Sequence, residues 1–173
     1  MTRGNALECG ASPAASLSPR LKVSESGAMP DALAFTLKLD EITPSLAALS
    51  DDALKGRVLL GMGTVVESFA VRAFDEPGLR PTAWPARKKS KATNPLLIKS
   101  GNLRQSIHTQ VQGTESVKVG TPAVYGAAHQ LGSTKRGIPA RPFFPVIEDQ
   151  LTGAAQAEIR DVVDALIGGA AGN

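Results

Sequence analysis

The stretch Tyr125–Phe144 reads YGAAHQLGSTKRGIPARPFF and decides how the second half of the chain folds. Its first residues contain no proline and end at Gly132, which predicts a short helix over 123–131 with that glycine as its C-cap. A basic loop follows, and then the sequence Ile-Pro-Ala-Arg-Pro-Phe-Phe, in which two prolines fix φ and remove backbone donors. A loop next to so rigid a segment is typical of a recognition or assembly element.

The flanking sequence predicts a hairpin before this stretch and a helix after it. Alternation of apolar and polar residues over 106–119, with a turn at Gly113, indicates a β-hairpin. An apolar stripe that starts at Pro145 or Glu148 and continues to Ile167 indicates an amphipathic helix. The adjacent acids Glu148 and Asp149 would then lie at its start, where the helix dipole favours them.

The N-terminal half adds one strand and one long helix. Leu33, Phe35, Leu37 and Leu39 alternate with less apolar residues, the pattern of a half-buried strand. A short helical piece through Leu49 comes next, and Ser50 or Asp51 can cap a long helix that ends near Phe74. These elements predict an α+β fold, with a small antiparallel sheet that includes a β-hairpin packed against a long amphipathic helix and a C-terminal helix.

Composition divides the chain into one domain and two tails. Residues 1–30 are rich in Ser, Ala, Pro and Gly and predict a disordered arm, 31–168 form a single domain, and 169–173 are expected to fray. The single cysteine, Cys9, excludes an internal disulfide. No run of residues is long and apolar enough to predict a membrane span, so we expect no membrane partner.

Basic residues concentrate between residues 77 and 147, where eleven Lys and Arg face one acid, Glu115. Within this region 77–98 is predicted to be a long basic loop, and we expect it to contact DNA or an acidic protein through its cationic run. That run consists of Arg87, Lys88, Lys89 and Lys91. Solvated loops without a partner are the simpler alternative. Trp84 either anchors a partner or attaches the loop to the domain.

Nothing in the sequence predicts catalysis, a cofactor or a metal site. His108 and His129 are not spaced with other ligands as a metal site requires, and no nucleotide-binding loop is present. Tyr125 and His129 lie four residues apart on one helical face, which favours a structural hydrogen bond or an interface contact over acid–base chemistry. We therefore predict that the protein is not an enzyme.

Three motifs in order resemble a known family. They are Ser100-Gly101-x-Leu103-x-x-Ser106-Ile107, Tyr125-Gly126-Ala127-Ala128-His129-Gln130-Leu131-Gly132 and Ile138-Pro139-Ala140-Arg141-Pro142-Phe143-Phe144. With the hairpin and the final helix, they resemble the phage virion morphogenesis, or tail completion, family of Mu-like tailed phages and prophages. The resemblance covers about residues 33–167. Gly126 stands where alanine is commoner in that family, and Leu131 where an aromatic residue is usual.

The resemblance implies a structural protein of the virion that is assembled in the bacterial host cytoplasm. Such proteins act at the head–tail junction as homo-oligomeric rings, commonly hexamers, which complete the tail and help to join it to the head. The implied partners are further copies of the chain, other neck, tail-tube or tail-terminator proteins, and DNA in the channel. The alternatives are a small basic nucleic-acid-associated protein, or an enzyme or domain of another kind.

On this reading, the stretch Tyr125–Phe144 supplies the contacts between subunits. The interface residues that it predicts are Tyr125, His129, Arg141, Phe143 and Phe144. Arg141 would offer a forked donor to a carboxylate or a carbonyl of the neighbour. The two phenylalanines either anchor in a neighbour's pocket or fill the domain's own core, and we expect one ring to face each way.

Overall fold

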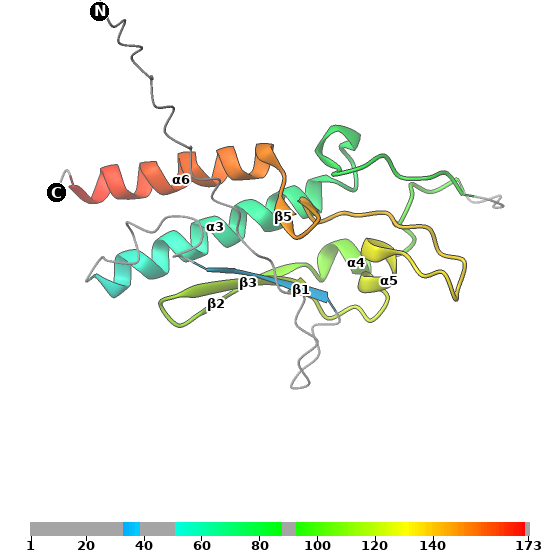
Figure 1. Cartoon of the computed structure of the whole chain (residues 1–173), viewed down its shortest axis with the longest axis horizontal. Helices are drawn as coiled ribbons and strands as arrows, with labels where there is room; N and C mark the ends of the chain where they lie inside the picture. The colour runs from blue at the N-terminus through cyan, green and yellow to red at the C-terminus, as the bar shows by residue number, and fades with distance from the viewer. Residues whose placement is uncertain (1–32, 39–50, 88–92, 172–173) are drawn as a thin grey trace, which may run out of the picture.

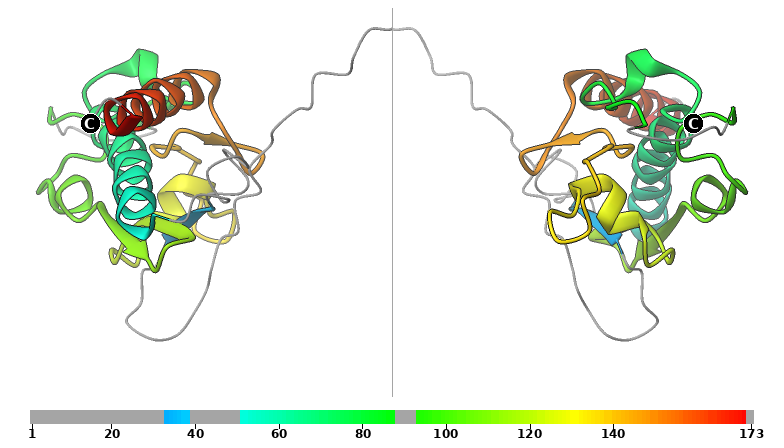
Figure 2. Two further views of the ribbon diagram at one scale, coloured as in Figure 1. Left: turned by 90° about the vertical axis from the view of Figure 1, so that its left-hand side faces the viewer. Right: turned by 90° about the vertical axis from the view of Figure 1, so that its right-hand side faces the viewer.

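The computed structural model describes residues 33–38, 51–87 and 93–171. Helix α6 lies over helix α3, and α3 lies over a small antiparallel sheet (Figures 1 and 2). The elements in chain order are β1 (Leu33–Lys38), α3 (Asp52–Arg72), the 3-10 helix η1 (Pro77–Leu79), α4 (Asn102–Gln105), β2 (His108–Gln112), β3 (Ser116–Thr121), α5 (Gly126–Leu131), β4 (Val146–Ile147), β5 (Gln150–Leu151) and α6 (Gly153–Ala171). This arrangement confirms the predicted α+β class.

The sheet has the order β1-β3-β2, and both pairings are antiparallel. The hairpin of β2 and β3 and the first strand are therefore where the sequence predicts them. Phe35 lies opposite Val119 and Leu37 opposite Val117, and all four side chains are buried. Alternate residues of a strand point to the same face of the sheet, so these four side chains form one apolar face beneath α3.

Helix α3 begins after Asp51, whose carboxylate accepts hydrogen bonds from the backbone N–H groups of Ala53 and Leu54, at 2.9 and 3.2 Å. This confirms the predicted cap, because the side chain satisfies two N–H groups that have no partner within the helix. Ser50 and the helical piece expected before it lie outside the described residues, as do the expected disordered arm and Leu39.

Two glycines bring the three layers close together. A Cβ atom at Gly61 would lie 3.0 Å from Cγ1 of Val162 in α6, and one at Gly63 would lie 2.7 Å from Cγ2 of Val117 in β3. Positions two residues apart lie on nearly opposite faces of a helix. Each glycine therefore allows one neighbouring layer to approach the backbone of α3.

The predicted start of the last helix, at Pro145 or Glu148, is wrong. Residues 146–151 instead form a small hairpin in which Val146 pairs with Leu151. Glu148 and Asp149 form its two-residue turn with φ of 48° and 62°. A two-residue hairpin loop of type I′ requires positive φ at both positions, which Asp tolerates better than most residues but Glu does not. Their carboxylates therefore do not lie at a helix start.

Helix α6 starts only at Gly153 and then continues to Ala171. It thus includes residues 169–171, where the sequence predicted a frayed tail, while 172–173 lie outside the described residues. The apolar side chains at Leu151, Ala155, Ile159 and Val163 are buried, as the predicted stripe requires. Ile147 lies four residues before Leu151, the spacing of a helical stripe, but it is exposed.

Five aromatic rings connect the sheet to the long loop through the core. Successive pairs of ring centroids are separated by 4.8 Å (Phe35–Phe144), 4.9 Å (Phe144–Phe143), 5.5 Å (Phe143–Phe74) and 5.8 Å (Phe74–Trp84). Such edge-on and tilted contacts add to the free energy gained from burial. The end of α3, the loop after it and the stretch Tyr125–Phe144 are therefore parts of one core.

Candidate interaction site: a basic groove at one end of the domain

The stretch Tyr125–Phe144 forms a helix, a tight loop and a returning strand-like segment. Helix α5 ends at Gly132, which has φ of 78° and confirms the predicted C-cap. Backbone hydrogen bonds of 2.8 and 2.9 Å between Ser133 and Ile138 close the loop. The chain therefore reverses, and residues 139–144 run back alongside α5.

The returning segment is held to α5 by backbone and side-chain hydrogen bonds. The N–H of Arg141 donates to the carbonyl of His129 at 2.6 Å. Oε1 of the buried Gln130 accepts from the N–H groups of Phe143 and Phe144, at 2.9 and 3.1 Å. Sequence reasoning did not single out Gln130, because its partners become neighbours only once the chain has reversed.

Phe143 and Phe144 both lie in the subunit's own core. The two side chains are 0% exposed, and their rings contact Phe74 and Phe35, respectively. The expectation that one ring faces a neighbouring subunit is therefore wrong. A pair of aromatic residues after Pro142 is apolar enough for either role, and the reversal of the chain at 132–140 decides which one it takes.

Arg141 also has an intrachain role. Only 8% of the residue is exposed, and its guanidinium donates from Nε and Nη2 to the carbonyl of Pro85 at 3.0 and 2.8 Å. Nη2 also lies 3.3 Å from the carbonyl of Ala86. The forked donor thus binds carbonyl groups of the 77–98 loop in the same chain, instead of a neighbour as the sequence suggested.

Trp84 attaches the same loop to the domain. Its indole Nε1 donates to the carbonyl of Pro142 at 2.7 Å, and the guanidinium of Arg80 stacks 4.0 Å from its ring centre. Because the residue is buried, the structure supports the attachment role and not a recognition role for this tryptophan. The 77–98 loop and the Tyr125–Phe144 stretch are consequently neighbours.

A groove of about 370 Å³ lies where these two segments meet, and we refer to it as the basic groove. Its cationic residues are Arg87, Lys99 and Arg141, and Tyr125 and His129 of the predicted interface also line it. The remaining lining residues are Asn94, Leu96, Leu97, Ser100, Asn102 and Leu103. Among the described residues, the lining contains no Asp or Glu. The structure thus brings Arg87 of the predicted cationic run together with Tyr125, His129 and Arg141 of the predicted subunit interface.

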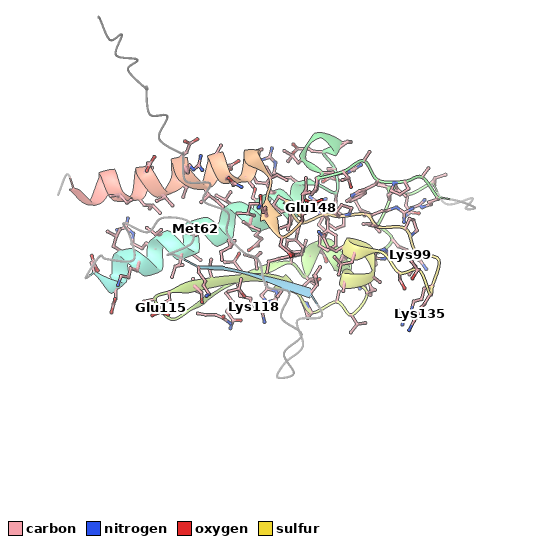
Figure 3. All side chains as sticks on the ribbon, viewed as in Figure 1. Met62, Lys99, Glu115, Lys118, Lys135 and Glu148 are labelled. Atoms are coloured by element: carbon pink, nitrogen blue, oxygen red, sulfur yellow. The ribbon has the colours of Figure 1, made fainter. Side chains whose placement is uncertain are left out.

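Not every predicted cation can be placed. Lys88, Lys89 and Lys91 lie outside the described residues, although they follow Arg87 directly in the sequence. Arg87 donates from Nη2 to the carbonyl of Pro95 at 2.8 Å. Lys99 and Lys135 extend from the same end of the molecule, whereas Glu115 lies at the opposite end (Figure 3). One end of the domain is therefore basic.

His129 lies at the side of this groove. Its Nδ1 atom is buried and has no hydrogen-bond partner among the described residues. Burial lowers the pKa of His129, and the positive charge of Arg141 lowers it further. The ring meets that of Tyr125 edge-on at 6.1 Å, so the predicted pair is in ring contact. Its role at a subunit interface remains a prediction.

The lowered pKa predicts a loss of stability on acidification. As the pH falls below 6.5, the ordinary pKa of histidine, His129 binds a proton more readily in the unfolded chain than in the folded one. The free energy of unfolding therefore decreases as the pH falls below 6.5. Urea unfolding at pH 7.5 and 5.5 measures this change. We expect a smaller decrease in His129→Gln than in the wild type, while His108→Gln serves as the exposed control. Equal decreases in all three proteins would contradict the prediction.

The described residues contain no group of three His, Cys, Asp or Glu side chains arranged to hold a metal ion. In the same part of the chain, no helix combines the length and apolar character needed to cross a bilayer.

Comparison with known proteins gives one match, and it covers most of the domain. The phage virion morphogenesis family matches residues 39–167, about three-quarters of the chain. No curated protein and no solved structure matches significantly. The matched region runs from the end of β1 through the basic groove into α6, and it includes all three motifs on which the resemblance rests. The chain belongs to the phage virion morphogenesis family.

Proposed function

We propose that the protein is a structural subunit of the virion at the head–tail junction. It forms a homo-oligomeric ring that completes the tail and helps to join it to the head. The observation that carries this proposal is the family match over 39–167, which spans α3, the β2–β3 hairpin, the basic groove and most of α6. A hexamer is the expected stoichiometry, and other neck, tail-tube or tail-terminator proteins are the expected partners.

The surface around α5 supports a role in assembly. Val124 is 77% exposed and Leu131 is 63% exposed, and the partly exposed Tyr125 lies between them in the chain. Tyr125 lines the basic groove, and Val124 directly precedes it in the chain. Exposed apolar residues next to a charged rim are characteristic of protein interfaces. We propose a binding role for this surface and no catalytic one.

The competing function is that of a small nucleic-acid-associated protein. The basic end of the domain favours it, because Lys and Arg side chains neutralise phosphates without reading sequence. DNA passing through the ring is also compatible with the proposed function. The two functions differ in whether the isolated protein assembles.

The size of the purified protein tests the proposal. We expect light scattering and negative-stain images to show discrete rings, and we expect deletion in the encoding phage to leave DNA-filled heads and unjoined tails that a plasmid copy rescues. A monomer that binds DNA with strong salt dependence would favour the competing function. Normal tailed particles from the deletion strain would contradict a role at the junction.

A further inference from the structure

Arg141 is a buried cation whose hydrogen-bond partners are neutral. Its guanidinium contacts the carbonyls of Pro85 and Ala86, and it forms no ion pair with any carboxylate of the described residues. A buried charge is costly unless an opposite charge compensates it. Because the described lining of the basic groove contains Arg141 with two further cations and no acid, the groove is suited to a carboxylate from outside the subunit.

The shape of the groove favours a peptide over DNA. Leu96, Leu97 and Leu103 provide apolar lining, which a phosphodiester backbone cannot use. A volume of about 370 Å³ holds a few amino-acid residues. The matching ligand is therefore a short peptide with acidic residues next to an apolar one.

The chain itself contains such a segment between β1 and α3. Residues 39–52 read LDEITPSLAALSDD, with four acids and no Lys or Arg. Asp40 and Glu41 precede Ile42 directly, which is the combination that the groove requires. Residues 39–50 lie outside the described residues, but the elements on both sides of them are placed.

The end of β1 and the start of α3, which flank this segment, lie far from the groove of their own subunit. Lys38, the last residue of β1, pairs with Ser116, the first residue of β3. The turn between β2 and β3 and the start of α3 lie at the same end of the molecule (Figure 1). The groove lies beyond the other end of α3, where Arg104 of α4 forms an ion pair with Asp75. The helix is 21 residues long, which corresponds to about 30 Å.

The segment is too short to bridge that distance and return. A loop between Lys38 and Asp52 can extend only about 20–25 Å from its ends, even when fully stretched. The groove of a second copy has no such restriction. Contact between opposite ends of identical subunits is heterologous, and it closes into a ring when the rotation between subunits allows.

We propose that the segment Asp40-Glu41-Ile42 of one subunit binds in the basic groove of the next copy. The carboxylates meet Arg87, Lys99 and Arg141, and the isoleucine packs on the leucines. The contact repeats head to tail around the ring. This inference rests on the proposed function, because it supplies the subunit contact of the ring.

Charge reversal on the two sides of the contact tests the inference. We expect Asp40→Lys/Glu41→Lys and Arg87→Glu/Lys99→Glu each to raise the dissociation constant of assembly at least tenfold. A mixture of the two variants should assemble, because each then offers the other a complementary segment and groove. One chain that carries all four substitutions should also assemble. Light scattering measures each case, and circular dichroism verifies folding.

Lys135→Glu/Arg136→Glu is the matched control, since both residues are exposed at the same end of the molecule but do not belong to the basic groove. Lys99→Glu alone replaces the double groove variant if that variant does not fold.

Unchanged rings in the groove variants, or no recovery in the mixture, would overturn this contact but leave the ring itself intact. A wild type that stays monomeric would overturn both the contact and the proposed function. Loss of DNA binding with unchanged rings would assign the groove to nucleic acid and reject the contact.

Discussion

Replacing Phe144 with alanine is expected to lower the free energy of unfolding by about 3–5 kcal/mol, the usual loss when a buried aromatic ring is removed. The ring is 0% exposed and lies between Phe35 of the sheet and Phe143. Its removal leaves a cavity where the sheet meets the returning segment. Urea unfolding followed by circular dichroism measures the change.

Leu131→Ala is the matched control for this prediction. Leu131 lies in the same stretch and is also apolar, but it is 63% exposed, so its removal should change the free energy of unfolding by less than about 0.5 kcal/mol. Phe144→Ala could instead remain as stable as the wild type and fail to form rings. That result would mean that the ring contacts a neighbour, as the sequence first suggested, and would contradict the burial seen here.

Replacing Gly63 with alanine is expected to lower the free energy of unfolding by about 1–3 kcal/mol, as overpacking does. The added Cβ atom would lie 2.7 Å from Cγ2 of Val117 and would also meet the side chain of Thr109. Both neighbours belong to buried or half-buried strand positions beneath α3, so neither can move aside without shifting the sheet.

Gly56→Ala provides the opposite case in the same helix. Apart from its chain neighbours and the backbone of its own helix, no described atom lies within 4 Å of a Cβ atom at Gly56, so alanine there should raise the free energy of unfolding by up to about 1 kcal/mol through its higher helix propensity. Chemical denaturation of the two variants and the wild type compares them directly. A stabilising effect at both positions would show that α3 does not approach the sheet as closely as described.

Local patterns were sufficient for the elements whose signals lie within a few residues. Alternation predicted β1 and the β2–β3 hairpin, and an acidic cap followed by an apolar stripe predicted α3. The C-cap at Gly132 was equally local. The hairpin of β4 and β5 was missed because the spacing of Ile147 and Leu151 fits a helix as well as a two-residue turn. Only the positive φ of Glu148 and Asp149 separates these alternatives.

The roles of the site residues depended on contacts between distant parts of the chain. The sequence singled out Tyr125, His129, Arg141 and Arg87 in two separate groups, and the structure brings all four to one groove, while their role at an interface remains a prediction. It could not show that Arg141 binds the carbonyl of Pro85, 56 residues away.

By itself, the sequence determined the fold class, the family and the basic character of one region, because periodicity, motif order and charge are properties of the chain alone. Only the tertiary structure decided that both phenylalanines of Tyr125–Phe144 face inward and that its arginine joins the 77–98 loop at a groove. Burial and hydrogen-bond partners are set by which segments meet in space. In this protein, the chain reversal at 132–140 and the attachment of Trp84 to Pro142 bring those segments together.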